Sequence, residues 1–118
     1  MEVYFVGNTE DSNYALIAKE LIENFGHGIT CTSFGAEVMV VVLTGYDEGV
    51  VHEIASFCTE RITTDPNTAP KVIIIHDAEI LPDRRLSQFI SDNDFVNEVW
   101  CDDLDEVCDN LTTFLETA

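Results

Sequence analysis

Three stretches of the chain are almost wholly apolar and too short to be ordinary helices. They cover residues 2–7, 38–43 and 71–76, and are rich in valine and isoleucine. A strand with one wet face alternates apolar and polar residues, whereas a central parallel strand, covered on both faces, shows a nearly continuous apolar run. We therefore predict three buried strands here and a last strand over residues 95–100.

The segments between these runs carry apolar residues at helical spacing. This spacing predicts helices over residues 11–25, 50–62, 86–91 and 104–115. Asp11 or Ser12 is available to cap the first helix, and Gly26 stands just beyond its end. Residues 63–70, rich in Thr, Asn and Pro, predict a surface loop.

Strands that alternate with helices indicate an α/β fold, because two parallel strands are normally joined by a helical crossover. We predict a single domain over residues 1–118, with a small doubly wound, Rossmann or flavodoxin-like parallel sheet of four to five strands and flanking helices. The four main strands are expected to lie in the sheet in their sequence order. Residues 28–34 contain β-branched residues but lie too close to Val38 for a parallel crossover, so we expect an irregular connection or a short edge piece.

The charge balance is strongly acidic, with 23 acidic and 5 basic residues and a formal charge of −18. A nucleic acid polymer is excluded as a partner, because its phosphates require a clustered basic surface. Acidic residues spread over every helix, with almost no lysine, are typical of proteins adapted to concentrated salt, where the Debye length falls to about 3 Å at 1 M. We expect a halophilic protein, with an ordinary acidic protein as the alternative.

No apolar run is long enough to cross a membrane, and the N-terminus enters a strand-like run without a basic leader. We therefore expect a cytoplasmic protein. The four cysteines and three histidines lack the spacing of metal ligands, so we expect no metal and no cofactor, with reduced thiols that pack as small hydrophobic groups. Among the histidines, only His52 gains interest, from its neighbour Glu53.

Ligands of open parallel sheets bind beyond the carboxyl ends of the strands. Two loops are predicted there. The first covers residues 7–9 and includes Gly7 and Asn8, and the second covers residues 44–49. Neither has the glycine and lysine spacing of a phosphate-binding loop or a dinucleotide fingerprint. The second loop leads into the helix that carries Glu53 one turn from its start. This position suits a rigidly held catalytic carboxylate, and it equally suits an acid that only complements the helix dipole.

Residues 46–55, with Asp47, Gly49 and Glu53 at matching intervals, resemble the motif of the nucleoside 2-deoxyribosyltransferase family and its deoxynucleotide N-glycosidase relatives. Other parts of the chain are similar to the same family. They are the opening strand (3–7), the first helix (14–26), the strand before the motif (36–43), the serine-containing segment (86–90) and the last strand (95–100).

The resemblance implies a role for each matching residue. Glu53 would be the nucleophile that attacks the anomeric carbon, and Asp47 would contact the 5′-hydroxyl of the sugar. Tyr4 would lie near the base and sugar, or would simply be half-buried in the sheet. Ser87 would reach the site of a neighbouring subunit, which implies a homodimer, or would be a helix cap or surface hydroxyl.

One departure from the family pattern concerns the acid that assists the leaving base. Family members carry it on an extra helical stretch, but residues 26–36 are too short for that stretch and contain no Asp or Glu. Glu37 and Glu48 are possible substitutes. Ala55 also stands where the family often has Gly.

The leading hypothesis is therefore an N-glycosidic-bond hydrolase or transferase that acts on a (deoxy)nucleoside, a nucleotide or a nicotinamide riboside linkage. The alternative is a non-catalytic nucleoside-binding, nucleotide-binding or interaction module that retains the fold. A structural or regulatory domain, in which Glu53 only complements the helix dipole, is a third hypothesis.

Overall fold

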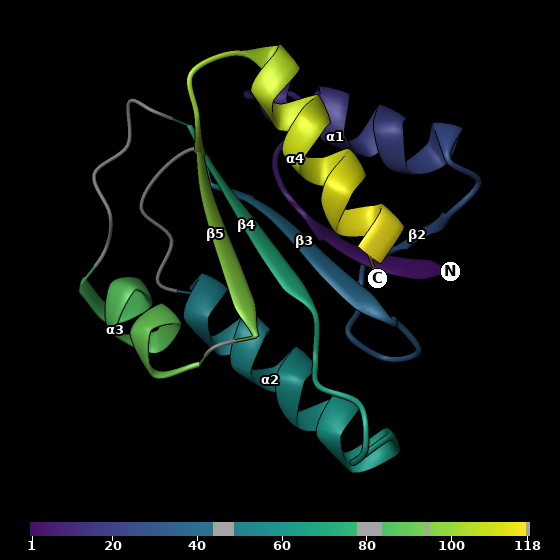
Figure 1. Cartoon of the computed structure of the whole chain (residues 1–118), viewed down its shortest axis with the longest axis vertical. Coiled ribbons are helices and arrows are strands. Elements are labelled where there is room, and N and C mark those ends of the chain that lie inside the picture. The colour runs from purple at the N-terminus through teal and green to yellow at the C-terminus, as the bar shows by residue number, and fades with distance from the viewer. Residues whose placement is uncertain (44–48, 78–83, 94, 118) are drawn as a thin grey trace.

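The computed structural model describes residues 1–43, 49–77, 84–93 and 95–117 (Figure 1). The strands found in these ranges are β1 (Glu2–Val6), β2 (Gly28–Thr30), β3 (Val38–Leu43), β4 (Val72–Asp77) and β5 (Val96–Cys101). The helices are α1 (Asn13–Asn24), α2 (Gly49–Thr64), α3 (Arg84–Asp92) and α4 (Leu104–Thr117). The predicted elements are therefore present, with ends that differ by a few residues.

The strands form one sheet in the order β2-β1-β3-β4-β5, and every neighbouring pair is parallel. The prediction of a small doubly wound parallel sheet is confirmed, and the four main strands lie in their sequence order. After β1 the chain adds β2 on one side of it. The chain then crosses to the other side of β1, where it adds β3, β4 and β5 in turn. The strand order therefore reverses between β1 and β3, which is where such folds bind ligands.

The segment that begins at Gly28 is a short edge strand, but the argument that two parallel strands need a longer link is wrong here. Residues 31–37 join β2 to β3 although both strands are parallel to β1, which lies between them. Because β2 pairs with β1 over only three residues, the chain has little distance to travel back. Gly35, at φ +78°, turns this link, and the buried Ala36 packs it onto the core.

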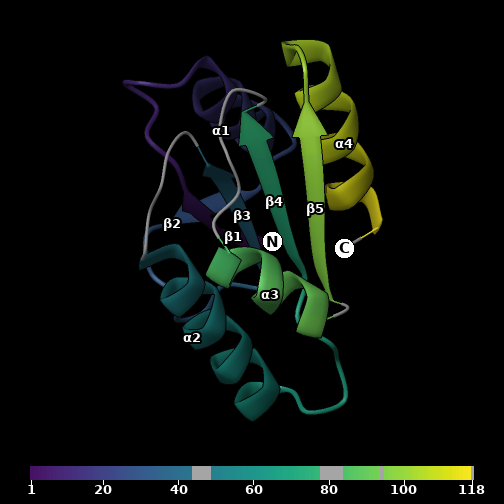
Figure 2. The same cartoon turned by 90° about the vertical axis from the view of Figure 1, so that its left-hand side faces the viewer.

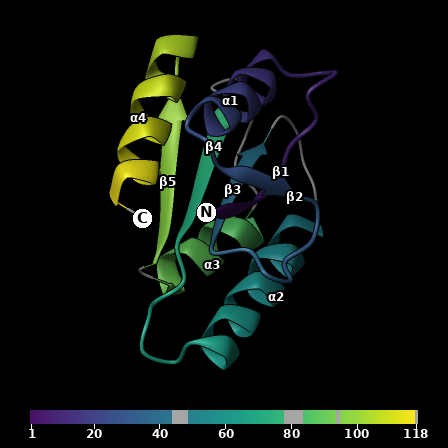
Figure 3. The ribbon, with the colours of Figure 1, turned by 90° about the vertical axis from the view of Figure 1, so that its right-hand side faces the viewer.

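The helices cover the two faces of the sheet in pairs, as Figures 2 and 3 show from opposite sides. On one face, α1 and α4 pack against strand residues such as Val3, Val40 and Ile75. On the other face, α2 packs against Tyr4 and Met39, among others, with α3 beside it. The alternation of side chains along each buried strand thus supplies two separate cores.

Local sequence signals set the ends of α1. The hydroxyl of Ser12 accepts a hydrogen bond from the backbone N–H of Ala15 at 3.1 Å, so Ser12 rather than Asp11 is the N-cap. Gly26 follows the helix at φ +81°, a left-handed conformation that favours glycine. Three of the apolar residues at helical spacing are nevertheless exposed: Leu16, Phe25 and Ile62.

Candidate functional site

The loop that leaves β1 is built around Gly7 and Asn8. A Cβ on Gly7 would lie 3.1 Å from the Phe5 ring and 3.2 Å from the Ala15 Cβ, so the absent side chain lets the strand end pack closely on α1. The Asn8 carboxamide accepts from the backbone N–H of Glu10 and donates to Asp11 at 2.7 Å. Both residues therefore shape the loop, and their predicted contact with a ligand stays a prediction.

Tyr4, on the α2 face of the sheet, and Glu53, in α2, interact electrostatically near the point where the strand order reverses. Tyr4 is 9% exposed and its ring packs against Phe57, with 6.5 Å between ring centroids. Burial raises the pKa of the Tyr4 hydroxyl, and the negative charge of Glu53 and then that of Cys31 raise it further. Glu53, half-buried in α2, is thus near enough for its charge to raise the pKa of this hydroxyl.

The remaining sequence candidates are less informative. Asp47 and Glu48 lie outside the described residues. Gly49 begins α2, and Ser87 is exposed on α3, which packs beside α2. Glu37 is exposed just before β3, at the amino end of the strand and so opposite the carboxyl edge that Glu53 approaches.

His76 is the residue that sequence reasoning missed. It is only 1% exposed at the carboxyl end of β4, and its Nε2 lies 2.6 Å from Oε2 of Glu98 on β5. The imidazole stacks on Trp100 with ring centroids 3.9 Å apart and planes 9° from parallel. Within the described part of the chain, the buried Nδ1 of His76 has no hydrogen-bond partner.

The chemistry of this cluster follows from the pairing of His76 with Glu98. An ionised Glu98 accepts a hydrogen bond from Nε2–H, which leaves the lone pair on Nδ1 as a proton acceptor. The available signal was a histidine after the apolar run of β4 and a glutamate within β5. The register of β4 and β5 places His76 opposite Trp100 and Ile74 opposite Glu98. Only this register shows that His76 and Glu98 meet.

His52, the histidine favoured by its position beside Glu53, lines a shallow hollow of about 530 Å³ along α2. Ser33, Ala55, Ser56, Thr59 and Glu60 complete the lining. Neither Tyr4 nor Glu53 is part of that lining, so His52 and Glu53 face different surroundings.

The cysteines follow their sequence expectation only in part. All four are free thiols; Cys58 and Cys101 are buried, whereas Cys31 is exposed and does not pack as a small hydrophobic group. Burial raises the pKa of Cys58 to about 11. Over the residues that the structure describes, no three His, Cys, Asp or Glu side chains gather as a metal site would require, and no helix is long and apolar enough to span a bilayer.

Comparison with known proteins supports the fold alone. A de novo designed Rossmann 2x3 fold protein, solved by solution NMR, is similar to this chain with a TM-score of 0.58 and 13% sequence identity. The likeness covers 99% of this chain and 90% of the designed one. Neither a protein-family model nor a curated protein matches the sequence.

Proposed function

We propose that the protein is an N-glycosidic-bond hydrolase or transferase in which Glu53 is the nucleophile. The observation that supports this proposal is that the charge of Glu53, on α2, helps to raise the pKa of Tyr4, on β1, where the strand order reverses between β1 and β3. The substrate class is a (deoxy)nucleoside, a nucleotide or a nicotinamide riboside linkage, as the motif around Glu53 implies.

In the proposed reaction, a carboxylate oxygen of Glu53 attacks the anomeric carbon of the sugar. The new C–O bond forms as the C–N bond breaks, and the electron pair of that bond leaves with the base, which takes up a proton from the solvent. Water then releases the sugar, or an acceptor base replaces it, as in retaining glycosidases. The raised pKa of Tyr4 keeps its hydroxyl protonated, so it can donate a hydrogen bond to Glu53 or to the sugar.

The test compares Glu53→Gln with Glu20→Gln, an exposed glutamate on α1. Base release from a panel of nucleosides, nucleotides and nicotinamide dinucleotide is measured by chromatography in molar KCl, which suits the acidic composition. We expect Glu53→Gln to reduce turnover by at least about 10³-fold, and mass spectrometry to find the sugar on Glu53 of the parent protein. Unchanged turnover in Glu53→Gln would remove this residue from the mechanism.

A non-catalytic binding module is the second candidate, and the missing acid favours it. Glu37 does not replace that acid, because it precedes β3 at the amino edge of the sheet. A binding module would be stabilised by its ligand, by about 2.7 kcal/mol at a hundred times Kd, without forming any product. A purely structural domain would show neither effect.

A homodimer belongs to the same proposal, because Ser87 is exposed on α3 beside α2 and is open to a second copy. Sedimentation at molar KCl distinguishes a dimer from a monomer. A monomer at every concentration that supports turnover would remove Ser87 from the site.

A further inference from the structure

The outer edge of β5 has backbone groups available for another strand. β5 pairs with β4 along one edge over six residues, and no described strand pairs with its other edge. In an edge strand, alternate N–H and C=O groups point away from the sheet and accept an added chain. The sequence of β5 contains neither proline nor lysine, two residues that commonly protect such edges.

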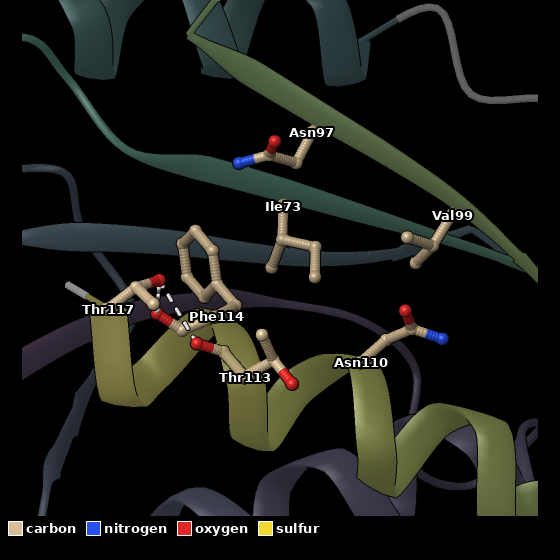
Figure 4. Close-up of a pocket in the computed structure, with 7 residues that line it drawn as sticks. All are labelled: Ile73, Asn97, Val99, Asn110, Thr113, Phe114 and Thr117. Carbon is tan, nitrogen blue, oxygen red and sulfur yellow. Dashed lines mark hydrogen bonds between the residues drawn. The ribbon is translucent and has the colours of Figure 1, made fainter.

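A groove runs beside this edge, between β5 and α4 (Figure 4). Its volume is about 230 Å³, below the range of roughly 300–1,000 Å³ that is typical of small-molecule pockets. Ile73, Val99 and Phe114 provide its apolar part, while Asn97 and Asn110, with two threonines of α4, provide neutral polar groups. The size and the lining suit one inserted apolar side chain rather than a whole ligand.

The opposite face of β5 presents a different pair of side chains. Trp100 is 43% exposed beyond its stack on His76, and Glu98 is 26% exposed. Both side chains lie on the α3 face, whereas Asn97 and Val99 face α4. An exposed indole next to a carboxylate attracts a lysine or arginine side chain through cation–π and ionic contacts.

The surroundings of the edge are acidic. Exposed carboxylates stand near both ends of β5, at Asp92, Asp102 and Asp103, and along α4 at Asp109 and Glu116. Such a surface favours a basic occupant over a second copy of this chain, whose formal charge is −18.

We propose that the β5 edge binds an extended basic peptide segment of a partner protein by strand addition. Side chains of an added strand alternate between the two faces of the sheet. Its apolar side chains enter the groove of Ile73, Val99 and Phe114, and its basic side chains meet Trp100 and Glu98. The recognised pattern is therefore an alternation of apolar and basic residues, and this site is independent of the Glu53 chemistry.

The experiment uses the full chain, isotope-labelled for NMR, at the lowest salt at which it remains folded. The probe is a capped peptide of alternating lysine and leucine. It is compared with a block-sequence peptide of the same composition and with a version whose backbone amides are N-methylated. We expect the alternating peptide to shift resonances of β5 and α4 and the fluorescence of Trp100, which is the single tryptophan. The other two peptides should bind at least about tenfold more weakly.

A matched pair of variants locates the binding. Thr113 and Thr63 are both exposed helical threonines whose hydroxyls donate to the carbonyl four residues earlier, but only Thr113 lines the groove. Thr113→Arg should weaken binding at least about tenfold. Thr63→Arg should change it by no more than about twofold.

Three results would overturn the proposal. They are no binding of the alternating peptide at millimolar concentration, equal binding of the block or N-methylated peptide, and equal weakening by Thr113→Arg and Thr63→Arg. A dimer of the peptide-free protein that Thr113→Arg dissociates would also overturn it, because a second copy would then be the occupant.

Discussion

The two faces of the sheet differ in the side chains that their cores contain. On the α1 and α4 face, the core contains aliphatic residues of three central strands, closed by Ala15, Ile22, Leu111 and others. Its polar groups join elements of the fold, as when Tyr14 on α1 donates from its hydroxyl to the carbonyl oxygen of Cys101 on β5 at 3.1 Å. This face stabilises the fold.

The α2 and α3 face combines its core with titratable groups. Tyr4 lies in that core beside Glu53, and His76 is buried against Glu98 and Trp100. A buried polar atom without a hydrogen-bond partner lowers the free energy of unfolding by about 1–3 kcal/mol. The unpartnered Nδ1 of His76 therefore lowers stability, and no contact in the described residues compensates for it. Tyr4 and His76, with the partly buried Glu53 and Glu98, therefore lie on or against the α2 and α3 face.

The largest expected effect is a loss of stability caused by a substitution in the core on the α1 and α4 face. Leu111 is fully buried, so Leu111→Ala should reduce the free energy of unfolding by about 2–5 kcal/mol through lost burial and a cavity. Urea denaturation measures this loss. Trp100 fluorescence of the folded variant should not change, because Trp100 lies on the other face.

The matched control for this substitution is Leu104→Ala, in the first turn of the same helix, where the side chain is 37% exposed. Its cost should stay near about 0.5 kcal/mol. Equal losses at Leu104 and Leu111 would contradict the placement of Leu111 in the buried core and of Leu104 outside it.

An intermediate loss of stability is expected from substitution of Glu98, which pairs with the buried His76 on the α2 and α3 face. Glu98→Ala would leave both nitrogens of His76 without a described partner and should cost about 1–3 kcal/mol. Glu98→Gln keeps an oxygen acceptor for Nε2–H and should cost less. Urea denaturation followed by Trp100 fluorescence reports stability and the stacked ring together, and equal losses for the two variants would argue against this hydrogen bond.

The smallest effect concerns the Tyr4 hydroxyl. Glu53→Gln removes the second cause of the raised pKa, so the pKa of Tyr4 should fall toward the ordinary 10.0 but stay above it, because burial remains. Ultraviolet titration of tyrosinate measures the change, with Tyr4→Phe used to subtract the other tyrosines. No change would place the Glu53 carboxylate away from this hydroxyl.

The same shift has a defined sign for stability. A tyrosine pKa that is higher in the folded state stabilises the fold fully below the unfolded value near 10.0, and this contribution is lost as the pH rises through the folded pKa. Glu53→Gln should therefore lose less stability than the parent protein on the alkaline side.

The candidate site could be predicted only in part. Glu53 was proposed because its motif is contiguous and lies near the start of a helix, and Tyr4 because the opening strand resembles that of the same family. His76 and Glu98 were missed because they are 22 positions apart and meet only through strand register. Gly7 and Asn8 were expected to contact a ligand; the structure shows their local roles in the loop, and the ligand contact stays a prediction.

The sequence by itself determined the buried strands, the helices and the parallel class of the sheet, because hydrophobic periodicity and caps such as Ser12 act over a few neighbouring residues. Only the tertiary structure decided that β2 joins β1 at the edge, that His76 stacks on Trp100, and that a groove opens between β5 and α4. These features depend on register and on the packing of helices over particular strands, which join residues far apart along the chain and leave no periodic signal in the sequence.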